Sequence, residues 1–225
     1  MTKSSPKRTG ECAFCGFEKP ITRDHLPPKG IFPTPKPHDL ITVPCCEDCR
    51  EGWSADDEYF RFAVVSACAG LGIESADAAN QTLLRSLSRP QQAGFAARVR
   101  ESLRSIEIVS PGGIYLADAG GIQIDKRRID RVADRIIRGL YWHERHYPVP
   151  EHYEVMNRAQ QAGLNAIFDS LGEVKFAEHR TVGNGMFQYT FAATDDDPDS
   201  MVWLSLFFGA LPFAGFVVKP KHLRE

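Results

Sequence analysis

The feature that most constrains this chain is a cluster of cysteines near its start. Six of the 225 residues are cysteines, and five of the six lie within the first fifty positions. These five are Cys12, Cys15, Cys45, Cys46 and Cys49. The polar stretch Met1 to Gly10 is not followed by the apolar run of a secretory signal, so we expect a cytoplasmic, reducing environment that disfavours disulfides. Clustered cysteines in such a setting usually bind a metal ion.

The cysteines form two pairs with Cys-x-x-Cys spacing. The predicted ligands of one structural Zn²⁺ ion are Cys12, Cys15, Cys46 and Cys49. Gly16, directly after the first pair, permits the positive φ that a tight turn between two ligands often needs. Cys45 fits the usual spacing less well but is an alternative to Cys46. Four thiolates in tetrahedral geometry select Zn²⁺, with an iron–sulfur cluster as the alternative occupant.

The competing interpretation is that these cysteines are ordinary buried thiols or that some of them form a disulfide. The paired spacing favours the metal site over both. The sixth cysteine, Cys68, lies within an apolar helical run. We therefore expect Cys68 to be a small core residue rather than a ligand.

Composition excludes several classes of protein. Hydrophobic residues make up 43% and charged residues 25% of the chain, which is typical of globular proteins and not of disordered or collagen-like chains. The formal net charge of −2 excludes a wholly basic nucleic-acid coat but allows a local basic face. The longest apolar stretch, 201–218, is interrupted by Gly209, Pro212 and Gly215, so no membrane span or membrane partner is expected.

The sequence predicts a leader and two folded parts. Residues 1–10 are expected to be a disordered leader, 11–70 a zinc-binding module with its following helix, and 71–225 an α+β domain. Residues 11–53 are rich in Cys and Pro and have little apolar periodicity, so they cannot fold by packing alone. The bound metal is therefore expected to hold this module together.

Apolar periodicity and turn residues predict the secondary structure of both parts. Helices are expected from the N-cap Ser54 to Gly70 or Gly72, over 75–88, over about 91–105, over 126–146 with Asp125 as N-cap, and around 155–171. Short strands are expected over 106–109, 114–116 and 122–124, followed by an antiparallel meander between 174 and 218. Helices and antiparallel strands in separate runs predict an α+β fold.

Between the two cysteine pairs lies an Asp-His sequence followed by prolines. The arrangement resembles the HNH endonuclease superfamily in its zinc-stapled ββα, or treble-clef, form. The residues that carry the resemblance are Cys12, Cys15, Asp24, His25, Pro27, Cys46 and Cys49. The resemblance covers residues 11–58, about a quarter of the chain. The segment Trp53 to Phe60 is similar to the continuation seen in some bacterial members.

The resemblance implies metal-dependent hydrolysis of phosphodiester bonds, with DNA as the substrate and RNA as the alternative. His25 would be the general base that takes a proton from the attacking water, a task suited to an imidazole with a pKa of about 6.5. Asp24 would be a ligand of a catalytic Mg²⁺ or Mn²⁺ ion. Because consecutive residues of a regular strand point to opposite faces, both side chains can serve one site only if the strand is distorted there.

One position departs from the family pattern. Members usually have Asn or His directly after the last cysteine, where it completes the catalytic metal site, whereas this chain has Arg50. A guanidinium cannot ligate a cation but can hold a phosphate. We therefore expect Arg50 to contact nucleic acid, together with the basic residues Arg23 and Lys29. The residues that could replace the missing ligand are His38, Asp39, Glu51 and Asp57.

Arg50 also supports a functional hypothesis of a different class. The chain would then be a non-catalytic zinc-binding module that holds nucleic acid or a protein partner. A third hypothesis is a nuclease subunit that stays silent until a partner completes or releases its site. The partner in that case is another protein or a second copy of the chain.

Three further patterns in the remaining chain have a structural and a functional interpretation. A helical stripe of arginines at 128, 131, 135 and 138 could follow a phosphate backbone, but a solvated face paired with local carboxylates is favoured. The aromatic residues Phe187, Tyr189 and Phe191 alternate along a strand and are expected in the core rather than stacked on bases. The acidic run 195–199 is expected to be a solvated turn.

Overall fold

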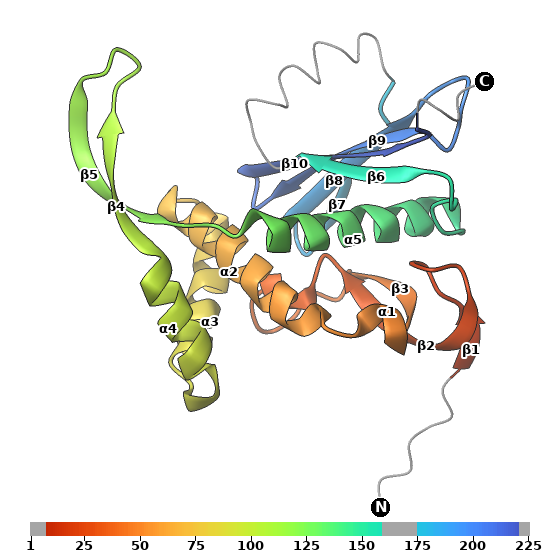
Figure 1. Cartoon of the computed structure of the whole chain (residues 1–225), viewed down its shortest axis with the longest axis horizontal. Helices are drawn as coiled ribbons and strands as arrows, with labels where there is room; N and C mark the ends of the chain where they lie inside the picture. Colours follow the sequence, from red (N-terminus) through yellow and green to blue (C-terminus); the bar gives the residue numbers. More distant parts are fainter. Residues whose placement is uncertain (1–7, 159–174, 221–225) are drawn as a thin grey trace, which may run out of the picture.

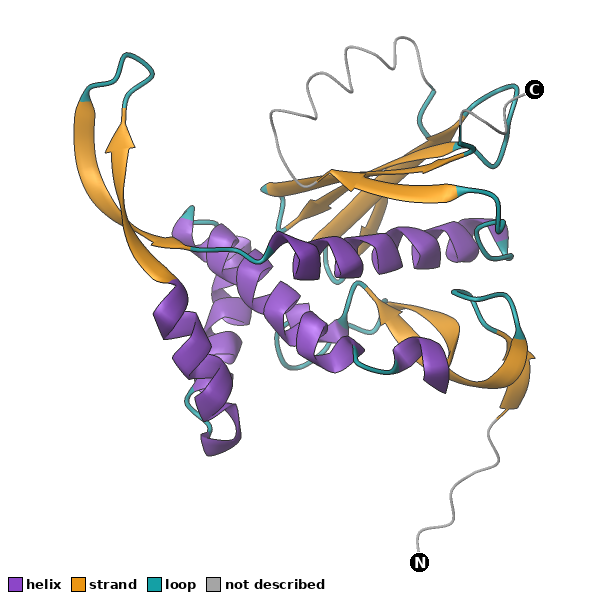
Figure 2. Ribbon diagram, in the orientation of Figure 1, coloured by secondary structure: helices purple, strands orange, loops and turns teal. Residues whose placement is uncertain are grey.

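A computed structural model describes residues 8–158 and 175–220 (Figure 1). The helices are α1 (Glu47–Arg50), α2 (Trp53–Gly70), α3 (Asp77–Leu87), α4 (Ala93–Ser102) and α5 (Lys126–Arg145), with short 3-10 turns η1 (Lys29–Ile31), η2 (Glu74–Ala76) and η3 (Pro90–Gln92). The strands are β1 (Arg8–Glu11), β2 (Glu18–Leu26), β3 (Ile41–Cys46), β4 (Leu103–Val109), β5 (Tyr115–Ile122), β6 (Glu154–Arg158), β7 (Arg180–Val182), β8 (Phe187–Ala193), β9 (Met201–Phe207) and β10 (Leu211–Val218). Helices and antiparallel sheets occur in separate runs, which confirms the α+β prediction (Figure 2).

The first sheet has the order β1-β2-β3, with antiparallel neighbours. The disordered leader was expected over residues 1–10, which is too long, because Arg8 to Gly10 belong to β1 and pair with β2. Residues 1–7 lie outside the described residues. The β2–β3 ladder runs without interruption from the pair Ile21–Cys46 to the pair Leu26–Ile41. This sheet therefore connects both cysteine pairs to the Asp-His sequence.

Helix α2 confirms the helix predicted after Ser54, and it ends at Gly70, one of the two expected ends, but it begins earlier. Gly52, with φ of 79°, is the N-cap, and the expected cap Ser54 lies inside the helix. Glycine adopts this left-handed conformation at little cost. Gly52 therefore caps the helix two positions before Ser54. The buried face of α2 consists of Phe60, Phe62, Val64, Val65 and Cys68.

The next segment contains two helices and a hairpin. Helix α3 agrees with the predicted helix, whereas α4 ends at Ser102 rather than at 105. Strand β4 begins at once and pairs with β5 in a two-stranded sheet. The third strand expected over 122–124 is wrong, since Ile122 is the last residue of β5.

Helix α5 is the central element of the fold. As predicted, Asp125 caps it, and its side chain accepts a hydrogen bond from the backbone N–H of Arg127 at 3.1 Å. The helix contacts α2, β2 and β3 on one side and β6 and β10 of the larger sheet on the other. Figure 1 shows α5 between the five-stranded sheet and the N-terminal elements. The buried face of α5 therefore joins the two halves of the chain.

The largest sheet has the order β6-β10-β9-β8-β7, with antiparallel neighbours. The predicted meander is confirmed for β8, β9 and β10. The helix predicted over 155–171 is wrong at its start, where β6 pairs with β10, and residues 159–174 lie outside the described residues. Phe187 and Tyr189 are buried and Phe191 packs on Trp203, which confirms their expected place in the core.

The acidic run 195–199 is more than a solvated turn. Asp199 accepts hydrogen bonds from the hydroxyls of Tyr141 at 2.6 Å and Tyr147 at 2.7 Å, and Asp197 accepts one from Tyr153 at 2.6 Å. Two carboxylates of the turn thereby fasten the end of α5 and the loop after it to the sheet.

One continuous hydrophobic cluster contains residues of both predicted parts, from Ala13 to Val217. Phe32, from the first part, lies where a side chain on Gly183 would have to be, which places the two parts in direct contact. Cysteine-rich and later segments therefore share one core. Within the described residues, none of the helices has the length and apolar character needed to cross a bilayer.

Candidate metal centre and the adjoining strand

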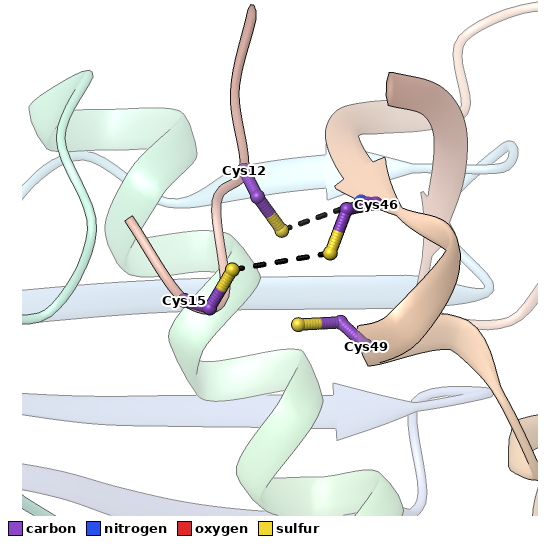
Figure 3. A group of neighbouring side chains, drawn as sticks. All are labelled: Cys12, Cys15, Cys46 and Cys49. Carbon is purple, nitrogen blue, oxygen red and sulfur yellow. Dashed lines mark hydrogen bonds between the residues drawn. The ribbon is translucent and has the colours of Figure 1, made fainter. Parts of the chain in front are cut away.

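Four cysteine side chains converge between the first turn of the sheet and the start of α1 (Figure 3). Their sulfur atoms all lie within 4.8 Å of one another. The four residues are the predicted ligands Cys12, Cys15, Cys46 and Cys49. Four soft donors at this separation suit one tetrahedral metal ion such as zinc. The predicted ligand set is thus brought together from positions more than thirty residues apart.

The first pair is held by a tight turn between β1 and β2. The backbone N–H of Gly16 donates to the carbonyl of Cys12 at 2.9 Å, and the N–H of Cys12 donates to the carbonyl of Phe17 at 3.1 Å. Gly16 has a φ of 70°, the left-handed conformation that favours glycine. The expected role of Gly16 is therefore confirmed, and the turn directs both sulfurs of the pair to one side.

The second pair spans the junction of β3 and α1. Cys46 is the last residue of β3 and the N-cap of α1, and Cys49 lies one helical turn further on. Two links tie this junction to the first pair: the N–H of Cys46 donates to Sγ of Cys12 at 3.3 Å, and the sulfurs of Cys15 and Cys46 are 3.9 Å apart.

The structure distinguishes Cys46 from Cys45. Cys46, and not Cys45, belongs to the group of four sulfurs that lie within 4.8 Å of one another. The buried thiol of Cys45 lies 3.2 Å from the carbonyl of Cys46, to which it donates. A hydrogen bond from Cys45, against the opposing effect of burial, lowers the pKa of Cys12 to about 3. Cys45 therefore lies beside the cluster and favours the thiolate form of Cys12, the form that binds metal.

Cys68 has the predicted structural role. It is fully buried in α2, with its sulfur 3.9 Å from the carbonyl of Phe207. Burial raises the pKa of this thiol to about 11. A protonated thiol surrounded by hydrocarbon is a core residue and not a metal ligand.

Asp24 and His25 occupy successive positions near the end of β2, opposite Val43 and Thr42. The ladder is regular here, so the two side chains lie on opposite faces of the strand. The distortion that would bring both to one site is therefore not found between Ile21 and Leu26. Asp24 is buried, whereas His25 is partly exposed on the same face as Arg23.

The buried carboxylate of Asp24 faces Arg135 of α5. Nε of Arg135 lies 3.9 Å from Oδ2 of Asp24, and this oxygen has no hydrogen-bond partner in the described part of the protein. The guanidinium of Arg135 also donates to Asp57 and lies 4.3 Å from the ring centroid of Trp53. One buried arginine thus serves two carboxylates and an aromatic ring.

Sequence reasoning placed Arg135 in a basic stripe and did not predict this role. Two further arginines of the stripe are also paired across elements: Arg128 and Arg131 both bind Asp56 of α2. These arginines are ion-paired, but the expected pairing with nearby carboxylates of α5 is wrong. Their partner lies on α2, while Asp130 binds Lys126 and Asp134 accepts a hydrogen bond from Asn157. The sequence signal for this buried role was the position of Arg135 beside the apolar positions Val132 and Ile136, where an arginine faces the core.

The pKa values of Asp24 and His25 are shifted in opposite directions. Burial raises the pKa of Asp24, although Arg135 and Arg50 act against it. Burial and the positive charge of Lys29 lower the pKa of His25, while Asp24 acts in the other direction. His25 is therefore a neutral imidazole at neutral pH and can accept a proton.

Two of the three predicted nucleic-acid contacts, Lys29 and Arg50, act on His25, and the third, Arg23, lies on the same face of β2. Arg23 is exposed two positions away on β2, Lys29 is exposed on η1, and Arg50 is exposed at the end of α1. The charges of Lys29 and Arg50 both act on His25. These cations give the exposed side of the imidazole a positive environment suited to a phosphate.

The residues considered as replacements for the missing ligand lie in other settings. Asp57 is bound to Arg135, and Asp39 accepts a hydrogen bond from the N–H of Gly183 at 2.9 Å. His38 and Glu51 are exposed. Within residues 8–158 and 175–220, the four cysteines are the one group of three or more His, Cys, Asp or Glu side chains close enough to share an ion.

The donor set around Asp24 does not fit a dedicated Mg²⁺ site. Mg²⁺ prefers several oxygen ligands in octahedral geometry. Asp24 offers a single carboxylate, and the positive charges of Arg135 and Arg50 both act on it. A divalent cation would have to displace or face these guanidinium groups, which cannot serve as ligands.

The chain was compared with known protein families, with curated proteins and with solved structures, and none of the three comparisons gives a match. The functional assignment therefore depends on the residues themselves. The observations that bear on it are the four-cysteine cluster and the environment of His25.

Proposed function

We propose that the chain is a nuclease of the zinc-stapled HNH type, with a treble-clef zinc module, that hydrolyses phosphodiester bonds of DNA with His25 as the general base. The observation that carries the proposal is the neutral, partly exposed imidazole of His25 among three exposed cations, on a strand joined to the four-cysteine cluster. Zinc would hold this strand and the start of α1 in one arrangement.

His25 would take a proton from a water molecule as the water attacks phosphorus. The P–O3′ bond then breaks, and the 3′ oxygen leaves with a proton from solvent. A positioned imidazole with a pKa below its ordinary value remains unprotonated at neutral pH, which suits a base. This step is expected to contribute about 10²–10⁴-fold to the rate.

Arg50 would neutralise the charge that develops on the phosphate. A guanidinium donates two parallel N–H groups to phosphate oxygens, and it stands where family members carry a metal-binding residue. Because the donors at Asp24 do not fit Mg²⁺ or Mn²⁺, the proposed hydrolysis uses neither ion. Asp24 instead acts as a positioning residue. Its carboxylate lies opposite Arg135, and its negative charge raises the pKa of His25.

The second candidate function is a non-catalytic zinc module that holds nucleic acid. Two observations favour it: Arg50 replaces a metal ligand, and Asp24 is engaged with Arg135. The three cations around His25 would serve this function without hydrolysis. Binding without cleavage is therefore the alternative outcome of the experiment below.

Relaxation of supercoiled plasmid tests the proposal. We compare the wild type with His25→Ala and Arg50→Ala, and with His38→Ala as a control in an exposed histidine. Each protein is assayed with added Mg²⁺, with added Mn²⁺ and without a divalent ion, and a labelled RNA of matched length is run in parallel. Wild type and His38→Ala are expected to nick the plasmid without a divalent ion, and His25→Ala to lose at least about 100-fold in rate.

The other outcomes are equally informative. Equal rates for wild type and His25→Ala would remove the catalytic role of His25. A strict need for Mg²⁺ or Mn²⁺ would return the phosphate-neutralising role to a metal ion. Cleavage of RNA alone would change the substrate, and retained binding with no cleavage under any condition would support the non-catalytic module.

A further inference from the structure

A second group of cations lies where the loop after β2 meets helix α2. Lys29 is in η1, Lys36 is in the loop that follows, and Arg61 is in α2. Turn η1 packs on α2, and a Cβ on Gly30 would lie 3.4 Å from Cδ of Arg61. Nζ of Lys36 donates to the carbonyl of Phe32 at 2.5 Å, which keeps this lysine beside the same turn. We call Lys29, Lys36 and Arg61 the cation cluster.

Arg61 carries N–H groups that nothing accepts among the residues that the structure describes. Its Nε and Nη2 atoms are shielded from solvent and have no hydrogen-bond partner there. In contrast, Arg128, Arg131 and Arg135 of the neighbouring helix α5 each bind a carboxylate. A shielded cation without a partner is costly. The unmatched guanidinium of Arg61 therefore indicates an acceptor from outside the chain.

The charges around the cation cluster leave it positive. Burial lowers the pKa of Arg61, and the charge of Arg89 acts in the same direction, while Glu58, one turn earlier on α2, acts against both. Burial also lowers the pKa of Lys36, and the charges of Arg61 and Lys29 add to this effect. Positive charge is thus in excess at this place. A bound anion would relieve the repulsion between these groups.

The kind of anion follows from the donors and from their place. A guanidinium and two ammonium groups are the donors that proteins use to hold phosphate. The charge of Lys29 acts both on His25 and on Lys36, so this lysine links the cation cluster to the imidazole. Cations that follow one another in this way match an anion whose charges recur along a chain. The sugar–phosphate backbone of nucleic acid is such an anion.

We infer that the cation cluster binds a second phosphate of the DNA strand, next to the phosphate held at His25. The inference rests on the proposed function for the place of the first phosphate. Arg61 is partly exposed, and its terminal group turns toward the strand on binding, a side-chain change that is common at interfaces. Lys29 and Lys36 add point charges from the loop. The protein therefore selects a polynucleotide over a mononucleotide.

DNA binding by the full-length, zinc-loaded protein tests the second phosphate site. All variants are made in His25→Ala, so that a labelled duplex of about 20 base pairs, two turns of the helix, stays intact. Arg61→Met is compared with Arg131→Met, which removes the same charge from an arginine whose partner also binds Arg128. By fluorescence anisotropy, Arg61→Met should raise the dissociation constant at least about fivefold and reduce its salt slope by about one. Arg131→Met should change the constant by less than about twofold, because its charge is already matched.

Urea unfolding separates binding from a structural role of Arg61. Since the guanidinium is unmatched in the free protein, Arg61→Met should leave the urea midpoint unchanged or raise it. Lys36→Gln is the second variant, because Lys36 is exposed and its replacement leaves the core intact. It should weaken DNA binding in the same way as Arg61→Met. A lower midpoint in Arg61→Met, with unchanged binding in Lys36→Gln, would make Arg61 a structural residue and overturn the inference.

The remaining outcomes decide between sources of phosphate. Equal dissociation constants for Arg61→Met and Arg131→Met would overturn the inference, as would a parent protein that binds no DNA. Calorimetric titration with inorganic phosphate is the second arm. Phosphate binding that depends on Arg61, with DNA affinity independent of it, would assign the site to free phosphate and contradict a strand contact. DNA binding that depends on the cation cluster, without plasmid cleavage by the wild type, would support the second site and remove only the catalytic proposal.

Discussion

The backbone N–H of Cys46 donates a hydrogen bond to Sγ of Cys12 over 3.3 Å. The start of α1 is therefore bonded directly to a ligand of the other pair, and the strand register of β2 and β3 places it there. Such N–H···S bonds stabilise thiolate, because they favour the charged form of the sulfur. The two halves of the cluster consequently depend on each other even though they lie far apart in the sequence.

Metal content distinguishes the two adjacent cysteines. We predict one zinc per chain by elemental analysis for the wild type and for Cys45→Ala. Cys46→Ala should lose most of its zinc, since its sulfur is one of the four that converge. A chelator that removes the ion should lower the midpoint of thermal unfolding, because the four cysteines join the turn after β1 to the start of α1. Loss of zinc in Cys45→Ala with retention in Cys46→Ala would reverse the ligand assignment.

Replacement of Arg135 should destabilise the fold strongly. Arg135→Met keeps much of the side-chain volume but leaves the carboxylates of Asp24 and Asp57 without their shared partner. Removing one member of a buried ion pair costs about 3–5 kcal/mol of the free energy of unfolding. Arg131→Ala is the control, because Arg131 is mostly exposed and its partner Asp56 keeps Arg128.

Urea unfolding at two pH values separates charge from packing in this variant. Burial raises the pKa of both Asp24 and Asp57, and loss of the arginine raises each further. A carboxyl whose pKa is higher in the folded than in the unfolded state costs stability at high pH and costs less as pH falls and it becomes neutral. The deficit of Arg135→Met should therefore be smaller at pH 5 than at pH 8. A deficit independent of pH would mean that lost packing, not unpaired charge, dominates.

The titration of His25 should respond to two neighbours in opposite directions. Lys29 lowers the pKa of His25 and Asp24 raises it. We predict that Lys29→Gln moves the pKa upward and Asp24→Asn moves it downward, as followed by the imidazole C–H signals in NMR. In a nuclease assay, the rising limb of the rate against pH should shift the same way, because the unprotonated imidazole is the base. Shifts of equal sign in both variants would contradict the arrangement.

Local patterns allowed the cysteine ligands and the main helices to be predicted. The spacing within each cysteine pair and the turn residue Gly16 are properties of a few adjacent residues. The helix over α5 and its cap Asp125 likewise follow from periodicity within one segment. Cys46 was favoured over Cys45 by spacing alone, and in the structure Cys46 is the one whose sulfur belongs to the group of four.

Features that depend on distant partners could not be predicted in this way. Strand β6 was expected to be helical. It is a strand because it pairs with β10, which lies more than fifty residues away and is not visible in any local pattern. The role of Arg135 depends on carboxylates from β2 and α2, which no pattern within α5 reveals. The regular β2 strand at Asp24 and His25 is a similar case, because pairing with β3 fixes which face each side chain takes.

The contact between α5 and β2 makes Gly139 sensitive to substitution. Gly139 is buried within α5, and a Cβ at this position would collide with the side chain of Leu26, next to the Asp-His sequence. Alanine favours a helix over glycine by about 1 kcal/mol, but overpacking costs about 1–3 kcal/mol. We therefore predict that Gly139→Ala lowers the free energy of unfolding. Gly70→Ala, at the end of α2, meets no atom within 4 Å and should leave stability unchanged or slightly raised, so equal urea midpoints for the two variants would exclude a tight α5–β2 contact.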